Sequence, residues 1–334
     1  MLTWNTFRKK LKQDGKNVSL QEQGKLWDEY KNAHKQNIPL SSLVVSNIHE
    51  GPRVSSGNVI VNKNPKSVGI SKLCKSNKNY KIVNETCKIY DENNTLIGYF
   101  LKGIITDTKL IEAGRNLKTY AQITTRRTQS AGTEKTMHTK NGATFKVANP
   151  VYSSIVGYME NTSFHGCRQT ALYKKHENLF DNETIKLIQF ISNKFKEYCP
   201  NEYKKQISFV KKVNKNMVLK GTCYTTLTIN KDFRTRTHTD KGDYNGGLGN
   251  LAVFNYEENG KLQTYKGGEF LLPDYNIGIK MEEGDLLFVD VHKTHCNNPI
   301  KGKGRMSLVC YARENLENRC KNTTKKELYN FKIH

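Results

Sequence analysis

The 334-residue sequence lacks several features that mark common protein classes. No apolar run approaches the roughly 20 residues that span a bilayer. The N-terminal segment MLTWNTFRKKLKQDGK lacks the apolar core of a signal peptide. The eight cysteines include no CxxC pair, which argues against a zinc finger and a compact disulfide framework. We therefore expect a soluble, intracellular protein with free thiols and no membrane partner.

Acidic residues are scarce. Asp and Glu total 31 against 54 Lys and Arg, which gives a formal net charge of +23. A chain this positive favours a polyanionic partner, and nucleic acid is the first candidate. The alternative is an AT-biased genome that raises Lys and Asn everywhere. A viral or phage source would suit that composition, and a nuclear location is expected only for a eukaryotic or viral protein.

Three parts are expected along the chain. Residues 1–36 predict a basic helical hairpin, in which SLQE provides a capping box and both tryptophans lie at helical spacing. Residues 37–80 predict a basic linker rich in Ser, Asn, Lys, Gly and Pro. Residues 81–334 predict the main domain. The hairpin is either a small core or an accessory DNA-binding element.

The main domain contains one clear helix, FDNETIKLIQFISNKFKEYCP, at residues 180–200. Asp181 or Asn182 is expected to cap it, and Pro200 to end it. Its buried stripe is expected to consist of Ile185, Ile188, Ile191 and Phe195. Upstream, a DENN turn between apolar segments predicts a β-hairpin, and TTRRTQSAGTEKTMHTKNG predicts a polar, basic loop.

Short strands with tight turns dominate the sequence after residue 218. They are TCYTTLTIN, NLAVFNY, GGEFLLP, NIGIKM, DLLFVDV and RMSLVCYAR. Strands at this spacing indicate a sandwich, jelly roll or barrel. The predicted fold class is therefore α+β, with a β core and at least one packed helix.

The segment RTRTHTDKGD carries His238 and Asp240, two residues apart. Side chains two apart on a strand share a face, so both can reach one ion. Alone, the pair is weak evidence for a metal site, because a turn beginning at Asp240 explains it equally well. A second histidine downstream strengthens it, since two histidines and one carboxylate form the facial triad of non-heme Fe(II) oxygenases. His292 and His295 compete for this position, and we favour His295 because it lies just beyond the strand that ends near Val291.

A basic residue follows at a suitable distance. Arg305 and Ser307 lie two apart on the final strand and share a face. A guanidinium fork with a nearby hydroxyl matches the distal carboxylate of an oxo-diacid cosubstrate such as 2-oxoglutarate. The open iron positions would take that cosubstrate and O₂.

Several segments together resemble the TET/JBP nucleic-acid dioxygenases, with a closer likeness to the base-J-binding-protein branch and its viral or phage relatives. They are NKDFRTRTHTDKGDYNGGLGNL, YKGGEFLLPDY, EEGDLLFVDVHKTHCNNPI and RMSLVCYARE, with weaker likeness upstream in NPVYSSIVGYME, GCRQTALYKKHENLF and PNEYKKQ. The resemblance covers roughly residues 85–320. It implies a double-stranded β-helix that uses Fe(II) and 2-oxoglutarate to hydroxylate the 5-methyl group of a pyrimidine in DNA. The kinetoplastid members convert thymine to 5-hydroxymethyluracil, and TET members oxidise 5-methylcytosine.

The resemblance also implies residue roles. His238, Asp240 and His295 would bind iron, and Arg305 with Ser307 would bind the distal carboxylate of 2-oxoglutarate. Other residues receive weaker assignments. Arg234 would bind the other end of the cosubstrate, and Asp243 and Arg313 would contact the target base. Arg126 and Arg127 would contact the DNA backbone. Relatives carry a histidine where this chain has Arg313. The cysteine-rich zinc region of animal TET enzymes and a recognisable J-binding insert are missing from the sequence.

Three alternatives stay open on the sequence alone. The base can be 5-methylcytosine instead of thymine. The same chemistry can act on RNA or on a protein side chain. A basic DNA-binding protein with an inactive β-helix is the non-enzyme alternative, although intact ligand and arginine positions argue against it. The sequence does not indicate the oligomeric state.

Overall fold

The computed structural model describes residues 23, 27, 28, 57–63, 80–125, 127–131, 134–160 and 166–320. The predicted helical hairpin at 1–36 lies almost entirely outside these residues, as does most of the predicted linker. The described part of the linker includes strand β1 (Gly57–Ile60), which pairs in parallel with β3 (Cys87–Tyr90) of the main sheet. Val59 and Val61 are buried, so this segment belongs to the β fold and does not act as a spacer.

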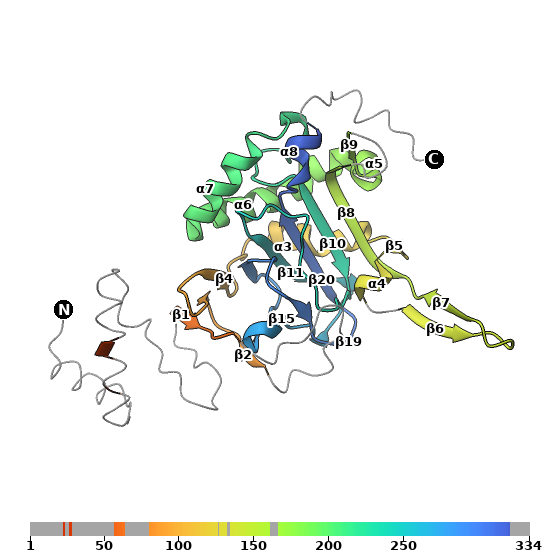
Figure 1. The fold of residues 1–334 in the computed structure, drawn as a ribbon. Helices are drawn as coiled ribbons and strands as arrows, with labels where there is room; N and C mark the ends of the chain where they lie inside the picture. Colours follow the sequence, from red (N-terminus) through yellow and green to blue (C-terminus); the bar gives the residue numbers. More distant parts are fainter. Residues whose placement is uncertain are drawn as a thin grey trace.

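A ten-stranded sheet forms the centre of the molecule (Figure 1). Its order is β1-β3-β4-β17-β11-β20-β10-β8-β5, with β9 paired to β8, and all pairs except β1 with β3 are antiparallel. The remaining strands are β4 (Leu96–Leu101), β5 (Ile123–Thr124), β8 (Val151–Glu160), β9 (Cys167–Gln169), β10 (Thr226–Lys231), β11 (Gly249–Asn255), β17 (Leu286–Val289) and β20 (Arg305–Tyr311).

A second sheet of four strands packs against one face of the first. Its order is β18 (Cys296–Asn297), β15 (Phe270–Leu272), β16 (Ile277–Ile279) and β2 (Lys81–Val83). Two short pairs form separate two-stranded sheets, β12 (Glu257–Glu258) with β13 (Lys261–Leu262) and β14 (Tyr265–Gly267) with β19 (Ile300–Gly302). Each sheet is antiparallel except for one edge pair, β1 with β3 and β2 with β16, and the two packed sheets give a jelly roll, the double-stranded β-helix expected from the sequence.

Helices cover the opposite face of the main sheet (Figure 1). They are α3 (Thr108–Asn116), α5 (Ala171–Leu179), α6 (Ile185–Tyr198), α7 (Pro200–Val210) and the short α8 (Asn315–Arg319). The strands sort their side chains between the two layers with a period of two. Leu251 and Val253 of β11 pack toward the second sheet, whereas Ala252 and Phe254 pack toward the helices. No helix among the described residues has the length and apolar character of a membrane span.

The helix predicted at residues 180–200 is present, with one correction. Its expected stripe of Ile185, Ile188, Ile191 and Phe195 is buried. The predicted cap is wrong, because residues Phe180–Thr184 form a π-helical turn that joins α6 to α5. The chain therefore enters α6 from a preceding helix and needs no side-chain cap. Pro200 ends α6 and also begins α7, as its fixed φ permits at a first helical position.

The polar, basic loop predicted at residues 124–142 contains regular structure instead. A short helix α4 (Thr128–Ala131) is followed by β6 (Glu134–His138), which pairs with β7 (Thr144–Ala148) as a projecting hairpin. A strand that buries neither face needs no alternation of apolar and polar residues. The usual sequence signal of a strand is therefore missing here.

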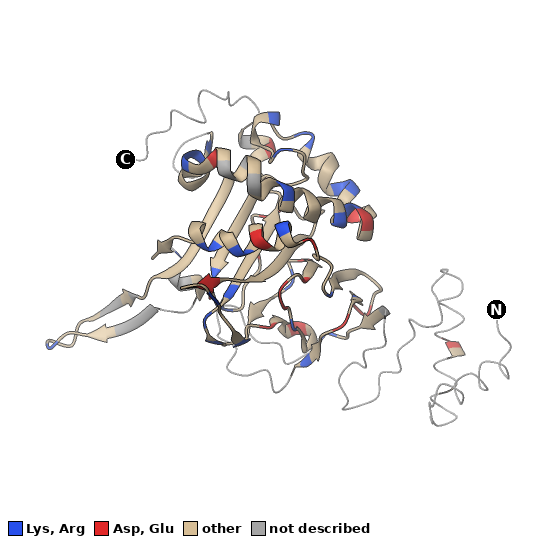
Figure 2. Ribbon diagram, turned by 180° about the vertical axis from the view of Figure 1, so that it is seen from behind, with Lys and Arg blue, Asp and Glu red and all other residues tan. Residues whose placement is uncertain are grey.

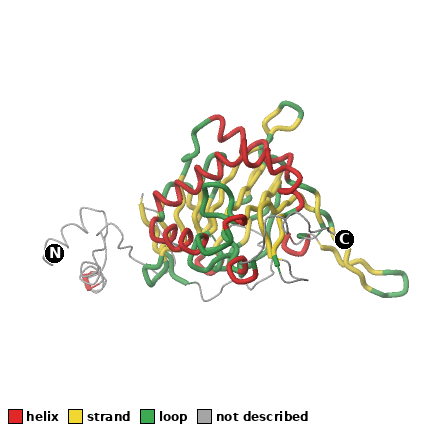
Figure 3. Tube along the Cα trace, turned by 90° about the horizontal axis from the view of Figure 1, so that it is seen from above, coloured by secondary structure: helices red, strands yellow, loops and turns green. Residues whose placement is uncertain are grey.

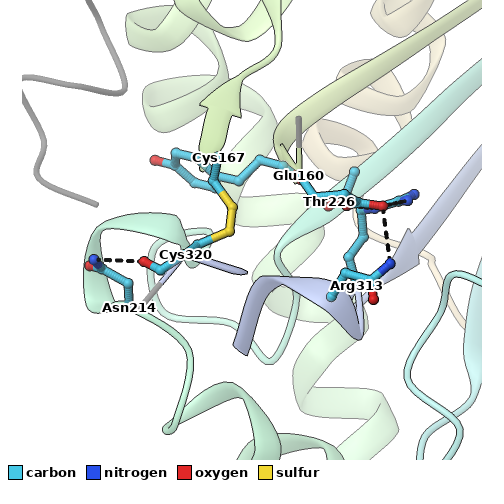
Figure 4. Close-up of a disulfide and its surroundings, with 8 residues drawn as sticks. Glu160, Cys167, Asn214, Thr226, Arg313 and Cys320 are labelled. Carbon is cyan, nitrogen blue, oxygen red and sulfur yellow. Dashed lines mark hydrogen bonds and ion pairs between the residues drawn. A yellow bond between two sulfur atoms is a disulfide. The ribbon is translucent and has the colours of Figure 1, made fainter. Parts of the chain in front are cut away.

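The expectation of free thiols is wrong for one pair. Cys167, in β9, and Cys320, just after α8, form a disulfide with Cα atoms 5.4 Å apart (Figure 4). The partners lie 153 residues apart, so no local spacing could reveal them. The other cysteines of the described part of the chain form no disulfide and are buried, namely Cys87, Cys199, Cys223, Cys296 and Cys310.

Candidate metal centre and cosubstrate pocket

Three potential metal ligands converge at one end of the jelly roll. His238 Nε2 lies 3.6 Å from Asp240 Oδ1, and His295 Nε2 lies 3.5 Å from Asp240 Oδ2. All three ligand atoms lie within 4.8 Å of one another. Neighbouring ligands of an octahedral ion with bonds of about 2.1 Å lie about 3 Å apart, so small adjustments would close this set around a metal.

Hydrogen bonds orient both imidazole rings toward the carboxylate. His238 Nδ1 lies 2.7 Å from the Arg236 carbonyl oxygen, and His295 Nδ1 lies 2.9 Å from that of Lys293. A carbonyl only accepts, so each Nδ1 carries the proton and donates it. Each Nε2 is then left with a lone pair facing Asp240. Backbone partners of this kind fix the tautomer of metal-binding histidines.

The backbone brings the ligands together from distant parts of the chain. His238 and His295 form an isolated antiparallel bridge, and each N–H donates to the other's carbonyl oxygen at 2.9 Å. The Asp240 N–H donates to the Val291 carbonyl oxygen at 2.9 Å. The loop after β10 is thereby joined to the segment after β17. Phe270 of β15 stacks on the His295 ring with centroids 5.2 Å apart and restricts its rotation.

The electrostatics of the cluster suit a divalent cation. Burial opposes ionisation of Asp240, but its contacts with His295 and His238 hold its pKa at about 2, so the carboxylate is charged. Burial, and then the neighbouring His295, lower the pKa of His238. A neutral imidazole and an ionised carboxylate are the protonation states that bind metals.

His292, the competing histidine, lies outside this cluster. Its Nε2 lies 3.1 Å from the Asp243 carbonyl oxygen, and its Nδ1 lies 3.3 Å from Asp290 Oδ1. It therefore links the strand end at Asp290 to the loop that carries Asp240 and Asp243. The preference for His295 as the distal ligand agrees with this geometry.

Arg305 lies at the start of β20 with 3% of its surface exposed. Its Nε is buried without a hydrogen-bond partner in the described structure. Burial lowers its pKa, against the opposing influence of nearby Tyr265. Leaving a buried guanidinium donor unsatisfied is costly, so Arg305 is suited to bind an anion. This orphaned donor fits the carboxylate of 2-oxoglutarate.

Two features of the pocket escaped the sequence analysis. Asp232, at φ +48°, accepts hydrogen bonds from the backbone N–H groups of Gly304 and Arg305, both at 2.9 Å, and so fixes the start of β20. Gly268, at φ +75°, lies against Arg305, and a Cβ there would lie 3.1 Å from Arg305 Cδ. The GG pair in YKGGEF was the available signal. Ser307 is buried in β20, two residues beyond Arg305.

Of the other predicted cosubstrate and DNA residues, the structure describes Arg234 and Arg127. Arg234 is half-buried in the loop before His238. The Arg127 guanidinium lies over the Phe233 ring, 5.4 Å from its centroid, and contributes to the electrostatics of Asp240. Arg126 lies outside the described residues.

The two residues predicted to face the target base lie next to each other. Asp243 and Arg313 form an isolated antiparallel bridge. Burial, and then the charge of Asp240, raise the pKa of Asp243. Arg313 makes a bidentate ion pair with Glu160, in which Nε donates to Oε2 at 2.7 Å and Nη2 donates to Oε1 (Figure 4). Glu160, at the end of β8, was missed because nothing local distinguishes it.

Comparison with known proteins shows what the segment that carries these residues is similar to. Residues 152–314 match a family model, Tet_JBP, described as the oxygenase domain of the 2OGFeDO superfamily. The chain is 30% identical over 174 residues to the bifunctional helicase and thymine dioxygenase JBP2 of Leishmania braziliensis. It is 31% identical over 173 residues to the thymine dioxygenase JBP1 of Trypanosoma brucei brucei.

These alignments are partial. They cover 50% and 48% of this chain but only 15% and 19% of the two relatives, so the chain spans less than a fifth of their length. Among solved structures, NgTET1 in complex with 5mC DNA matches with a TM-score of 0.53 and 16% identity. That match covers 80% of this chain and 88% of NgTET1, and at this identity it supports the fold.

Proposed function

The chain belongs, through residues 152–314, to the TET/JBP family of 2-oxoglutarate and iron oxygenases, and we propose that it hydroxylates the 5-methyl group of a pyrimidine in DNA. Thymine is the proposed base and 5-hydroxymethyluracil the proposed product. The observation that carries the proposal is the convergence of His238, Asp240 and His295 within 4.8 Å, together with the buried Arg305, whose Nε has no hydrogen-bond partner among the described residues. The names of the curated relatives, thymine dioxygenases, favour thymine.

In the proposed reaction, His238, Asp240 and His295 bind Fe(II), and Arg305 with Ser307 binds the distal carboxylate of 2-oxoglutarate. The bound iron and cosubstrate supply the oxidising chemistry that O₂ alone does not provide at a methyl group. The protein supplies geometry. The bonds from each Nδ1 to a backbone carbonyl aim the imidazoles, and Asp232 and Gly268 hold and accommodate Arg305. Arg234 is proposed to contact the other end of the cosubstrate.

Asp243 and Arg313 are proposed to contact the target base. Asp243 lies three residues after the metal ligand Asp240, and Arg313 is paired with Asp243 through the backbone. Arg313 would donate to a carbonyl oxygen of the pyrimidine. Glu160 accepts from Nε and from one Nη2 hydrogen of Arg313, so the remaining guanidinium hydrogens are proposed to donate to the base. A base stacked within a duplex cannot enter an active site, so the target nucleotide is expected to be flipped out.

The positive surface supports a DNA substrate. Beside Asp243, a surface cleft of about 610 Å³ lies between α7 and Tyr244, whose ring stacks on Phe209 with centroids 4.1 Å apart. Its lining includes Lys204, Lys205 and Lys212 against one acid, Glu202. Lysines and arginines neutralise phosphates without reading sequence. Arg126 and Arg127 are proposed to contribute further backbone contacts.

Nucleoside mass spectrometry tests the proposal. The protein is incubated with Fe(II), 2-oxoglutarate and DNA that contains either thymine alone or thymine and 5-methylcytosine. We expect 5-hydroxymethyluracil from both substrates. If only 5-hydroxymethylcytosine appears, the chemistry stands and the base is wrong. If neither appears while 2-oxoglutarate is consumed with RNA or peptide, the DNA assignment fails.

A metal-ligand variant supplies the control. Asp240→Ala is expected to abolish product while DNA affinity stays within about twofold, because phosphate contacts dominate affinity. A large loss of DNA affinity in this variant would contradict separate metal and phosphate contacts.

A further inference from the structure

One element projects from the body of the protein. The arm consists of β6 (Glu134–His138), β7 (Thr144–Ala148) and the turn between them, and it extends away from the body in Figures 1, 2 and 3. Its strands pair in regular register. The Thr139 N–H donates to the Ala143 carbonyl oxygen at 2.8 Å and closes the turn. The arm is therefore a formed hairpin.

Large exposed hydrophobic side chains concentrate on the arm and at its root. Met137 in β6 and Val147 in β7 are 47% and 39% exposed. At the root, Ile123 of β5 lies opposite Tyr152 of β8, and they are 61% and 46% exposed. Leu262 is the one other large hydrophobic residue classed as exposed in the described chain. An isolated two-stranded hairpin is only marginally stable in water, and gathered apolar exposure marks binding surfaces, so the arm is built to bind a partner.

The sequence of this region indicates the chemistry of that partner. Between residues 124 and 148 the basic residues are Arg126, Arg127, Lys135, Lys140 and Lys146, and the one acidic residue is Glu134. Lys140 lies exposed in the turn. A basic ribbon with exposed apolar side chains complements nucleic acid, in which phosphates flank apolar sugar and base surfaces.

The root of the arm is joined to the metal centre. The Arg236 N–H donates to the carbonyl oxygen of Ser130 in α4 at 2.7 Å. The Arg236 carbonyl oxygen in turn lies 2.7 Å from His238 Nδ1. Arg127, just before α4, lies over Phe233 of the same loop. A ligand held along the arm therefore meets the protein at the rim of the candidate active site.

We propose that the arm lies in a groove of duplex DNA beside the target nucleotide and holds the duplex against the metal centre. The major groove of B-DNA is about 12 Å wide and admits a two-stranded β-ribbon. Strands of this length, at about 3.3 Å per residue, reach about 17 Å, or about five base pairs. The positive charge of the arm sequence neutralises phosphates, and Met137 and Val147 contact the groove. This inference rests on the proposed DNA substrate and adds the surface that holds it.

Fluorescence anisotropy with a 30-base-pair duplex, at several salt concentrations, tests the arm. The variant K135Q/K140Q/K146Q is expected to bind at least about tenfold more weakly in about 0.1 M salt. The slope of log affinity against log salt is expected to fall by about 3, roughly one per lysine. The matched control K109Q/K186Q/K196Q removes the same charge from exposed positions on α3 and α6 and is expected to change the slope much less.

A second variant removes the arm itself. Residues 135–147 are replaced by Asn-Gly, a two-residue turn suited to a hairpin, so that Glu134 and Ala148, which are paired, stay connected. Its KM for duplex is expected to rise at least tenfold, whereas its turnover of a trinucleotide too short to reach the arm is unchanged. Equal losses in the lysine variant and its matched control would overturn the proposal. So would a dimer that the arm deletion dissolves while duplex affinity is preserved, since the arm would then bind a second copy.

The two proposals fail separately. If wild-type protein oxidises no DNA but the arm variants still lose duplex affinity, the proposed function fails and the arm contact stands. If wild-type protein oxidises DNA and the arm variants bind and turn over duplex normally, the arm contact fails and the function stands.

Discussion

Arg305 shows at the scale of a single residue how the pocket selects its ligand. Its side chain is nearly fully buried, and its Nε has no hydrogen-bond partner among the described residues. A bound carboxylate would satisfy this donor. The planar guanidinium also matches a carboxylate through two parallel hydrogen bonds, which a lysine ammonium cannot reproduce.

Arg305→Lys is accordingly expected to weaken 2-oxoglutarate binding about 10- to 100-fold, or about 1.4 to 2.8 kcal/mol. Ser307→Ala removes one hydroxyl hydrogen bond to the charged carboxylate and is expected to cost about tenfold. Anaerobic isothermal titration with Fe(II) measures both constants. Arg115→Lys, a matched change at an ion pair with Glu283, should leave the affinity unchanged. An unaltered affinity in Arg305→Lys would show that the carboxylate binds elsewhere.

Gly268 controls the same arginine through its missing side chain. A Cβ at this position would lie 3.1 Å from Arg305 Cδ and 3.2 Å from Nε, in addition to the strain of φ +75°. Gly268→Ala is therefore expected to lower 2-oxoglutarate affinity at least about tenfold by displacing the guanidinium. Gly260→Ala is the matched control, because φ is +71° there and nothing lies within 4 Å of the added Cβ. It should lower stability slightly and leave the affinity unchanged, and equal effects from the two variants would contradict the steric argument.

At the scale of elements, two long-range connections hold the C-terminal segment to the β8–β9 hairpin. Glu160 ends β8 and pairs with Arg313 just after β20, and Cys167 of β9 is bonded to Cys320 beyond α8 (Figure 4). Glu160 and Cys167 also lie opposite each other in the β8–β9 register. The ion pair and the disulfide therefore brace the same junction, beside the residues proposed to contact the base.

Glu160→Gln is expected to lower the free energy of unfolding by about 3 kcal/mol at pH 7, because it leaves a largely buried Arg313 without its counter-charge. Although burial opposes it, Arg313 lowers the pKa of Glu160 below its ordinary 4.5. A lowered folded pKa means that the ion pair contributes fully above about pH 4.5 and that its contribution is lost as the pH falls through the folded value. Urea titrations from pH 7 to pH 3 should show the two proteins converging in stability at low pH.

Glu197→Gln is the control for this measurement. Glu197 pairs with Lys194 on the exposed face of α6, and its side chain is 54% exposed. Removing such a pair changes stability by less than about 0.5 kcal/mol. A difference between wild type and Glu160→Gln that does not depend on pH would contradict the ion-pair explanation.

At the scale of the whole molecule, the periodicity of apolar residues in the sequence predicted the helices and strands that bury one or both faces. The apolar stripe of α6 and the strands after residue 218 were predictable because burial imposes a repeat of 3.6 or 2. The arm was not, because no core imposes a repeat on it. The π-turn before α6 and the pairing of Cys167 with Cys320 depend on tertiary contacts between segments that carry no mark of each other.

Some residues of the candidate site were likewise predictable from the sequence, and others were not. His238, Asp240, His295 and Arg305 were predictable because metal and carboxylate chemistry restrict residue types and their order along the strands. The supporting residues Asp232 and Glu160 were not, since any polar residue with the correct position serves. Their roles follow from folded geometry alone.

The central claim, that one set of side chains binds iron and 2-oxoglutarate together, is tested most directly by anaerobic thermal unfolding. For wild-type protein we predict a rise in Tm that is larger with both ligands than with either alone and corresponds to about 5.4 kcal/mol, about 2.7 kcal/mol from each ligand near 100 times its Kd. His238→Ala should unfold at a similar temperature without ligands and show no such rise. An equal rise in wild type and His238→Ala, or no rise in either, would contradict the claim.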